Sequence, residues 1–184
     1  MKKRTDVILK LREDRSALEK LLTEYVQTSW SINRFINLFN AFTVQGDIVL
    51  FSHKGIFAGS PLQRLSINIG AFLLGPFYFF YRKLYLFGIL FLIASSFIAY
   101  ISIKTGFKSI YLLNLAITLV VFIHVNAVYL RKFCDNLVKS GYGKVDEQYV
   151  LGYMKASGGV HNWALLGGVV YLITFVAMLV MIFS

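Results

Sequence analysis

Three long apolar runs that contain no Asp, Glu, Lys or Arg constrain this chain more than any other feature. They cover residues 84–103, 109–130 and 163–183 and consist mainly of Leu, Ile, Val, Phe and Ala. At 1.5 Å per residue, each run is long enough to cross the roughly 30 Å hydrocarbon core of a bilayer as a helix. Since 57% of all residues are apolar and only 15% are charged, a water-soluble fold is not expected. The sequence predicts an all-α polytopic membrane protein with three transmembrane helices.

A fourth apolar segment, residues 67–81, is too short to cross. As a helix it would reach only about 22 Å, and Gly75-Pro76 interrupts it because proline lacks a backbone donor and clashes with the preceding turn. We expect a re-entrant or interfacial segment that neighbouring helices shield from lipid.

The distribution of Lys and Arg predicts the orientation, because short cytoplasmic loops are enriched in them. With three crossings and a cytoplasmic amino terminus, the basic region 1–66, Arg82-Lys83 and the loop 131–162 share the cytoplasmic side. The opposite side receives only Lys104 and Lys108. The predicted organisation is therefore a cytoplasmic helical region at 1–66 and a membrane domain at 67–184. Within the loop, two short amphipathic helices are expected on either side of Gly141-Tyr142-Gly143.

The amino-terminal region begins with the stripe of an amphipathic helix over residues 5–28. Its apolar residues recur at steps of three, four or seven and are Val7, Leu11, Leu18, Leu21, Leu22 and Tyr25. The stripe either packs on the rest of its own chain or serves as a docking helix or short coiled coil that binds a partner.

A second helix is expected over residues 29–45, with Trp30, Phe35, Leu38 and Phe39 among its apolar side chains. Glycines and Pro61 then mark a connector over residues 46–66. Residues 48–51 in this connector fit either a short strand or a helical turn.

Residues 71–85 carry an Ala-Phe, a Gly-Pro and a Tyr-Arg-Lys ahead of an apolar run. The run resembles the signature of a bacterial family of small inner-membrane proteins classed as a domain of unknown function. The resemblance covers roughly residues 67–183, whereas residues 1–66 and the loop 131–162 resemble nothing we can name. It implies a multi-pass protein of the bacterial inner (cytoplasmic) membrane and no catalytic residues.

Cationic and aromatic residues at the ends of the runs are candidates for lipid anchoring. Lys and Arg extend their heads to the phosphate level while their stems stay against lipid, and Trp prefers the interface. The candidates are Arg82, Lys83, Arg131, Lys132 and Trp163. The four cations act either as simple positive-inside anchors or as a specific pocket for an anionic lipid.

Three residues inside the second predicted span carry an amide or imidazole side chain: Asn114, His124 and Asn126. Polar groups inside a membrane often have a function, which makes a proton relay one hypothesis. No carboxylate accompanies them, so we favour neutral side chains that join helices by hydrogen bonds. Cys134 is expected to be inert, and Gly167-Gly168 could allow close helix contact.

No catalytic, metal-binding, cofactor-binding or nucleic-acid-binding motif is present in the sequence. We therefore expect a non-enzymatic membrane subunit or adaptor whose cytoplasmic helices face a partner. The expected partners are anionic lipid headgroups together with another membrane protein or a second copy of the chain. The alternative is a small oligomeric channel or transporter lined by the three polar residues.

Overall fold

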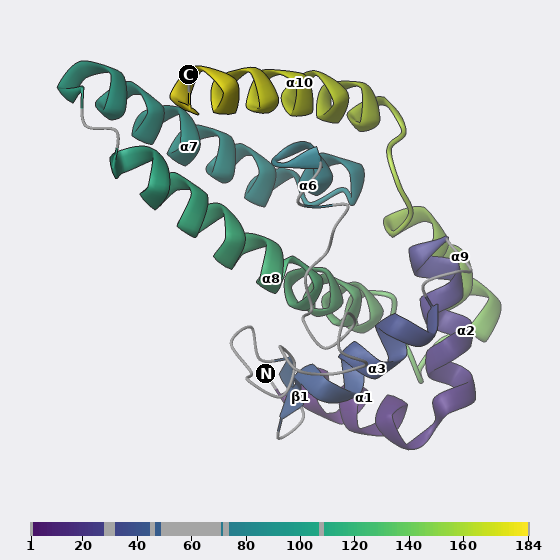
Figure 1. Cartoon of the computed structure of the whole chain (residues 1–184). Helices are drawn as coiled ribbons and strands as arrows, with labels where there is room; N and C mark the ends of the chain where they lie inside the picture. Colours follow the sequence, from purple (N-terminus) through teal and green to yellow (C-terminus); the bar gives the residue numbers. More distant parts are fainter. Residues whose placement is uncertain are drawn as a thin grey trace. The chain divides into compact units, whose positions relative to one another are not determined.

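The computed structural model describes two compact units. Unit 1 comprises Met1–Ser66 and His124–Val160, and unit 2 comprises Ile67–Ile123 and His161–Ser184 (Figure 1). The backbone is described for residues 2–27, 32–44, 47–48, 71, 74–106 and 109–183. Their side chains are described except for residues 2–4, 42, 44, 47–48, 99, 102–103, 109–115, 117, 120–123 and 174–183. This part of the chain contains eight helices and one short hairpin, which confirms the all-α class.

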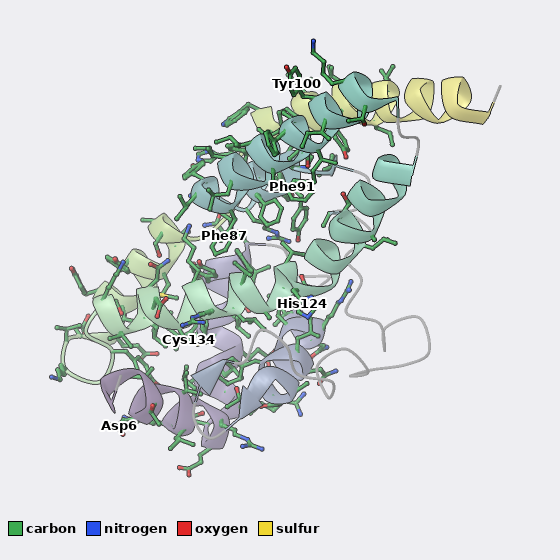
Figure 2. The ribbon with its side chains drawn as sticks, turned by 90° about the vertical axis from the view of Figure 1, so that its left-hand side faces the viewer. Asp6, Phe87, Phe91, Tyr100, His124 and Cys134 are labelled. Atoms are coloured by element: carbon green, nitrogen blue, oxygen red, sulfur yellow. The ribbon has the colours of Figure 1, made fainter. Side chains whose placement is uncertain are left out.

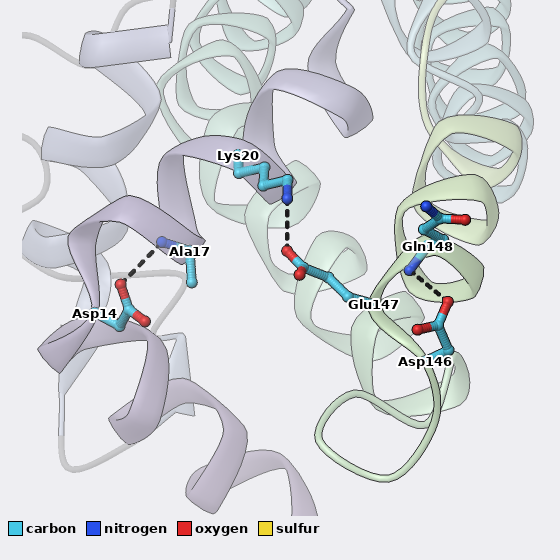
Figure 3. A network of polar contacts seen from close by, with 6 residues as sticks. All are labelled: Asp14, Ala17, Lys20, Asp146, Glu147 and Gln148. Carbon is cyan, nitrogen blue, oxygen red and sulfur yellow. Dashed lines mark hydrogen bonds and ion pairs between the residues drawn. The ribbon is translucent and has the colours of Figure 1, made fainter.

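Unit 1 begins with two helices, α1 (Lys2–Glu13) and α2 (Arg15–Val26). Asp14 separates them because its carboxylate accepts a hydrogen bond from the backbone N–H of Ala17 at 2.9 Å (Figure 3). Aspartate competes with helical hydrogen bonding in this way and is favoured at a helix start. The prediction of one continuous helix over residues 5–28 is therefore wrong at Asp14.

Helix α3 (Ile32–Phe42) lies within the second helix expected from the sequence and leads into a hairpin. Strand β1 (Thr43–Val44) pairs antiparallel with β2 (Asp47–Ile48). The Thr43 hydroxyl donates to the carbonyl oxygen of Phe39 at 2.6 Å, which ties the hairpin to the end of α3. Ile48 is thus in a strand, whereas Trp30 and residues 49–66 lie outside the described residues.

Helix α8 (Ser109–Lys139) continues past residue 130, where the sequence predicts its end. The loop expected at 131–162 therefore begins nine residues late, because Phe133 and Leu137 continue the apolar face of the helix and are fully buried. Gly141 and Gly143 then turn the chain with φ of 77° and 78°. The second expected short helix is present as α9 (Glu147–Ser157).

The core of unit 1 is built around Tyr25 at the end of α2. Its ring lies 5.1 Å from that of Tyr129 and 5.3 Å from that of Phe133, both on α8. Its carbonyl oxygen accepts a hydrogen bond from the backbone N–H of Gly159 at 2.6 Å, and its hydroxyl accepts one from Asn136 at 3.4 Å. One residue therefore joins α2 to α8 and to the end of α9.

Unit 2 contains α6 (Phe77–Tyr81), α7 (Tyr85–Thr105), the first part of α8 and α10 (Trp163–Phe183). All three long apolar runs are helical, as predicted. In the part of the chain that the structure describes, no helix is both long enough and apolar enough to cross a membrane. Gly75, with φ of 53°, and Pro76 form a turn before α6, which packs on α7 and α10 (Figure 1). The re-entrant placement of residues 67–81 stays a prediction.

A pair of glycine substitutions tests the packing around Tyr25. A methyl group on Gly158 would lie 2.2 Å from the Tyr25 carbonyl oxygen, so Gly158→Ala requires the backbone of α2 or α9 to move. We expect the free energy of unfolding to fall by about 1–3 kcal/mol. The midpoint of thermal unfolding, measured by circular dichroism, should fall with it. Gly152→Ala is the matched control in α9, where a methyl group meets nothing within 4 Å. It should raise stability by about 1 kcal/mol, because alanine favours the helix. If both variants changed the stability equally, the close contact between Gly158 and Tyr25 would be contradicted.

Candidate functional site

The most distinctive surface of this protein lies on α7 and α10 of unit 2. Leu86 on α7 is 66% exposed, Phe97 is 63% exposed, and Leu166 on α10 is 75% exposed. The other exposed apolar side chains of the two helices are Tyr85, Phe87, Ile89, Leu90, Ile93, Tyr100, Trp163, Leu165, Val169, Val170 and Ile173. Figure 2 shows Phe87 and Tyr100 on α7. We call the exposed apolar residues of these two helices the apolar surface of unit 2.

Charge is almost absent from unit 2. Residues 67–123 and 161–184 contain no Asp or Glu, and their cations are Arg82, Lys83, Lys104 and Lys108. None of these four lies between Tyr85 and Ile103 or within α10. A scattered exposed leucine is ordinary in a soluble protein, whereas many large exposed apolar side chains on two neighbouring helices are typical of a surface that contacts lipid or another apolar surface.

Three glycines allow the segment 74–77 to lie directly on α10. Gly167 faces the ring of Phe77, Gly168 faces Leu74, and Gly75 faces the ring of Tyr171. A methyl group on any of the three would lie 2.2–2.3 Å from an atom of its neighbour. The close contact expected of Gly167-Gly168 is therefore present, and its partner is the Gly75-Pro76 turn with the start of α6.

Arg82, at the end of α6, is enclosed by aromatic rings. Its guanidinium carbon lies 5.4 Å from the ring centre of Tyr81 and 5.9 Å from that of Tyr78. Its Nε also donates to the Tyr78 hydroxyl at 3.3 Å, and the residue is only 7% exposed. The arginine head, which the sequence places at lipid phosphates, therefore lies against protein. Lys83 follows with φ of 56° and is half-buried.

The first residues of α7 and α10 come together through aromatic side chains. Phe80 contacts both Tyr85 and Trp163, with ring centres 6.4 and 6.1 Å apart. His161 contacts the same two residues, at 5.9 and 6.4 Å. The backbone N–H of His161 also donates to the carbonyl oxygen of Tyr81 at 2.9 Å. We call Phe80, Tyr85, His161 and Trp163 the aromatic collar.

The remaining anchoring and polar candidates lie on α8. Arg131 and Lys132 are half-buried in unit 1. Asn126 is buried and His124 is half-buried, and both also belong to unit 1. Asn114 belongs to unit 2, and its side chain lies outside the described residues. The three polar residues of the predicted second span are therefore divided between two units.

The candidate partner-binding stripe lies inside unit 1. Leu11, Leu18, Leu21, Leu22 and Tyr25 are at most 2% exposed, and Val7 is half-buried. The role of a free docking face needs exposed side chains, so these five residues do not provide one. Packing on the same chain, the first of the two alternatives, agrees with this burial. The sequence did not single out Ile8, which is also fully buried.

Among the described residues of unit 1, most exposed side chains are polar. Lys20 on α2 pairs with Glu147 on α9 at 2.7 Å, and both side chains are more than half exposed (Figure 3). Burial, followed by the charges of Asp14 and Glu147, raises the pKa of Tyr142, so its hydroxyl stays protonated at neutral pH. Val145 and Tyr149 are large apolar residues that remain exposed here, Tyr149 at 60%. Cys134 is buried, as its expected inertness requires.

Among the described residues, no three His, Cys, Asp or Glu side chains lie together as a metal site would require. The geometry instead defines a helical protein with a well-packed unit and a charge-poor unit that exposes apolar helices.

The comparison with family models identifies the group to which such a chain belongs. Residues 23–134, more than half of the chain, match a family described as protein of unknown function (DUF2628). The chain belongs to this family. The match includes residues 71–85, but it begins inside α2 and ends in α8, whereas the resemblance was expected over 67–183. No curated protein and no solved structure matches the chain.

The contact between Gly168 and Leu74 predicts the effect of a larger side chain in α10. Gly168→Val should destabilise unit 2 by about 1–3 kcal/mol, because the new methyl groups displace Leu74. The measurement is the thermal unfolding midpoint of the purified chain in mild detergent. Ala94→Val is the control, since it adds the same side chain at an exposed site on α7. A midpoint lowered equally by both variants would argue against the close packing of α10.

Proposed function

We propose that this protein is a non-enzymatic membrane adaptor of the bacterial inner membrane, which lipid holds through unit 2 and which presents unit 1 to a partner. The observation that carries the proposal is the apolar surface of unit 2. Removing such a surface from water is favourable by about 25 cal/mol per Å² of apolar area, and a bilayer provides that environment without a specific protein partner. The helices need no backbone partners from lipid, because their hydrogen bonds are internal.

The topology proposed with this function is the one expected from the sequence. Three helices cross, the amino terminus and residues 131–162 face the cytoplasm, and Lys104 to Lys108 face the other side. The excess of cations on one side supports this orientation.

Two exposed positions test this topology. In a Cys134→Ser background, Gly106→Cys and Lys144→Cys each introduce one thiol at a residue that is exposed in the structure. A membrane-impermeant thiol reagent applied to intact cells should label position 106 and not position 144. Both positions should react after the cells are opened, so that a difference in intact cells reports sidedness and not burial. Labelling of position 144 in intact cells would contradict the topology, and recovery of the protein in an alkaline-washed supernatant would contradict membrane embedding.

The adaptor role is proposed for the outer surface of unit 1. The α1–α2 stripe is occupied by its own chain, so a partner must bind elsewhere. Val145 lies in the turn before α9 and Tyr149 in the first turn of α9. Both are exposed apolar side chains, and the other exposed side chains among the described residues of unit 1 are, apart from Leu9, mainly polar. An aromatic side chain surrounded by polar groups is a common centre of a protein interface.

Site-specific photo-cross-linking tests this surface. A benzophenone amino acid in place of Tyr149 should form one discrete adduct in growing cells, whose mass separates a second copy of the chain from a different protein. The control places the same amino acid at Asn33, an exposed residue of α3, where no adduct is expected. Absence of an adduct at Tyr149, or equal adducts at both positions, would contradict this interface.

The channel alternative receives no support from a specific observation. Its lining depended on Asn114, His124 and Asn126, and Asn126 is buried within unit 1. We therefore do not develop it as a second function.

A further inference from the structure

The aromatic collar marks the place where the apolar surface of unit 2 begins. On α7, Tyr85 is the first residue, and the exposed Leu86 follows it directly. On α10, Trp163 is the first residue, and the exposed Leu165 and Leu166 follow within one turn. In two helices far apart in the sequence, the exposed apolar residues thus begin at the same four-residue cluster.

The contacts of the collar fix the first residues of α7 and α10 next to each other. Phe80 and His161 each contact both Tyr85 and Trp163, so the four rings form a closed circuit of neighbours. The hydrogen bond from His161 to the carbonyl of Tyr81 joins the start of α10 to the end of α6 through the backbone. A register shift of one helix against the other would break these contacts.

The chemistry of the collar differs from that of a buried aromatic core. Trp163 is 55% exposed and Tyr85 is 42% exposed, although both rings pack on neighbours. Tyr, Trp and His combine an apolar ring with a polar N–H or O–H group, and such side chains prefer the boundary between hydrocarbon and water. Arg82 and Lys83 precede Tyr85 in the sequence, whereas no charged residue lies between Tyr85 and Lys104.

We propose that the aromatic collar binds the headgroup region of one bilayer leaflet and fixes the depth at which unit 2 is embedded. The partner is the lipid interface, because the exposed Tyr85 and Trp163 are each followed by exposed aliphatic residues along α7 and α10, an order that matches interface and acyl chain across a leaflet. The inference rests on the proposed membrane embedding and adds which residues define its level.

Tryptophan fluorescence tests this depth directly, since the chain contains only two tryptophans. A Trp30→Phe variant leaves Trp163 as the single emitter in the full chain reconstituted into vesicles of phosphatidylethanolamine and phosphatidylglycerol. Lipids with a nitroxide at the headgroup or near the carbonyl end of the acyl chain should quench Trp163 about twofold more strongly than lipids labelled near the chain terminus. Stronger quenching by the terminal label would place Trp163 at the bilayer centre and overturn the proposal.

A second emitter separates failure of the collar from failure of membrane embedding. The variant Trp30→Phe, Trp163→Phe, Phe97→Trp places the only tryptophan at an exposed site of α7 well beyond the collar. Position 97 should be quenched more strongly by the terminal label, which is the reverse of the order at Trp163. If position 97 follows this order while Trp163 is quenched by no lipid label, the collar proposal alone is overturned. If neither position is quenched by lipid, the membrane embedding fails, and the collar proposal fails with it.

Discussion

Apolar surface in contact with water is unfavourable in free energy, so an apolar helix face is stable only against lipid or another apolar surface. The organisation of unit 2 depends on this constraint. The backbone hydrogen bonds of α7 and α10 are formed within each helix, so the backbone needs no partners from the environment. The side chains therefore decide which environment suits these helices. Those side chains are largely apolar and exposed, with no carboxylate in the unit. The same property that makes lipid a suitable environment excludes acid–base and metal chemistry based on carboxylates within this unit.

Close backbone contact at glycine is the second feature that both units use. In unit 1, Gly158 lies against the carbonyl of Tyr25, and in unit 2, Gly167 and Gly168 lie against Phe77 and Leu74. A side chain at any of these glycines would separate the packed elements. These contacts place α9 on α2 and the α6 segment on α10. Two ion pairs, Lys20–Glu147 and Lys155–Glu24, also join α2 to α9. The exposed pair Lys20–Glu147 adds little by comparison, because exposed ion pairs contribute at most about 1 kcal/mol.

The family match covers parts of both compact units. The match over residues 23–134 begins near Tyr25 and ends just after Phe133, two residues whose rings are in contact in unit 1. It also includes the Gly75-Pro76 turn, α6 and α7 of unit 2. The family region therefore contains both the aromatic core of unit 1 and much of the apolar surface on which the proposed function depends.

Sequence pattern alone predicted the all-α class, the three apolar helices, α3, α9 and the turns at Gly75 and Gly141, because each follows from local periodicity or backbone preference. It also found Trp163 as a candidate interfacial residue. It could not predict that α8 continues to Lys139, because Arg131 and Lys132 resemble the end of an apolar run. The burial of Phe133, whose ring contacts Tyr25 of α2 and Phe39 of α3, is a tertiary effect. Three features appear only in the tertiary structure. Arg82 packs against two tyrosines, and the amphipathic stripe is buried within its own unit. The third feature is the aromatic collar. Those outcomes depend on contacts between residues that are distant in the chain, which local periodicity does not encode.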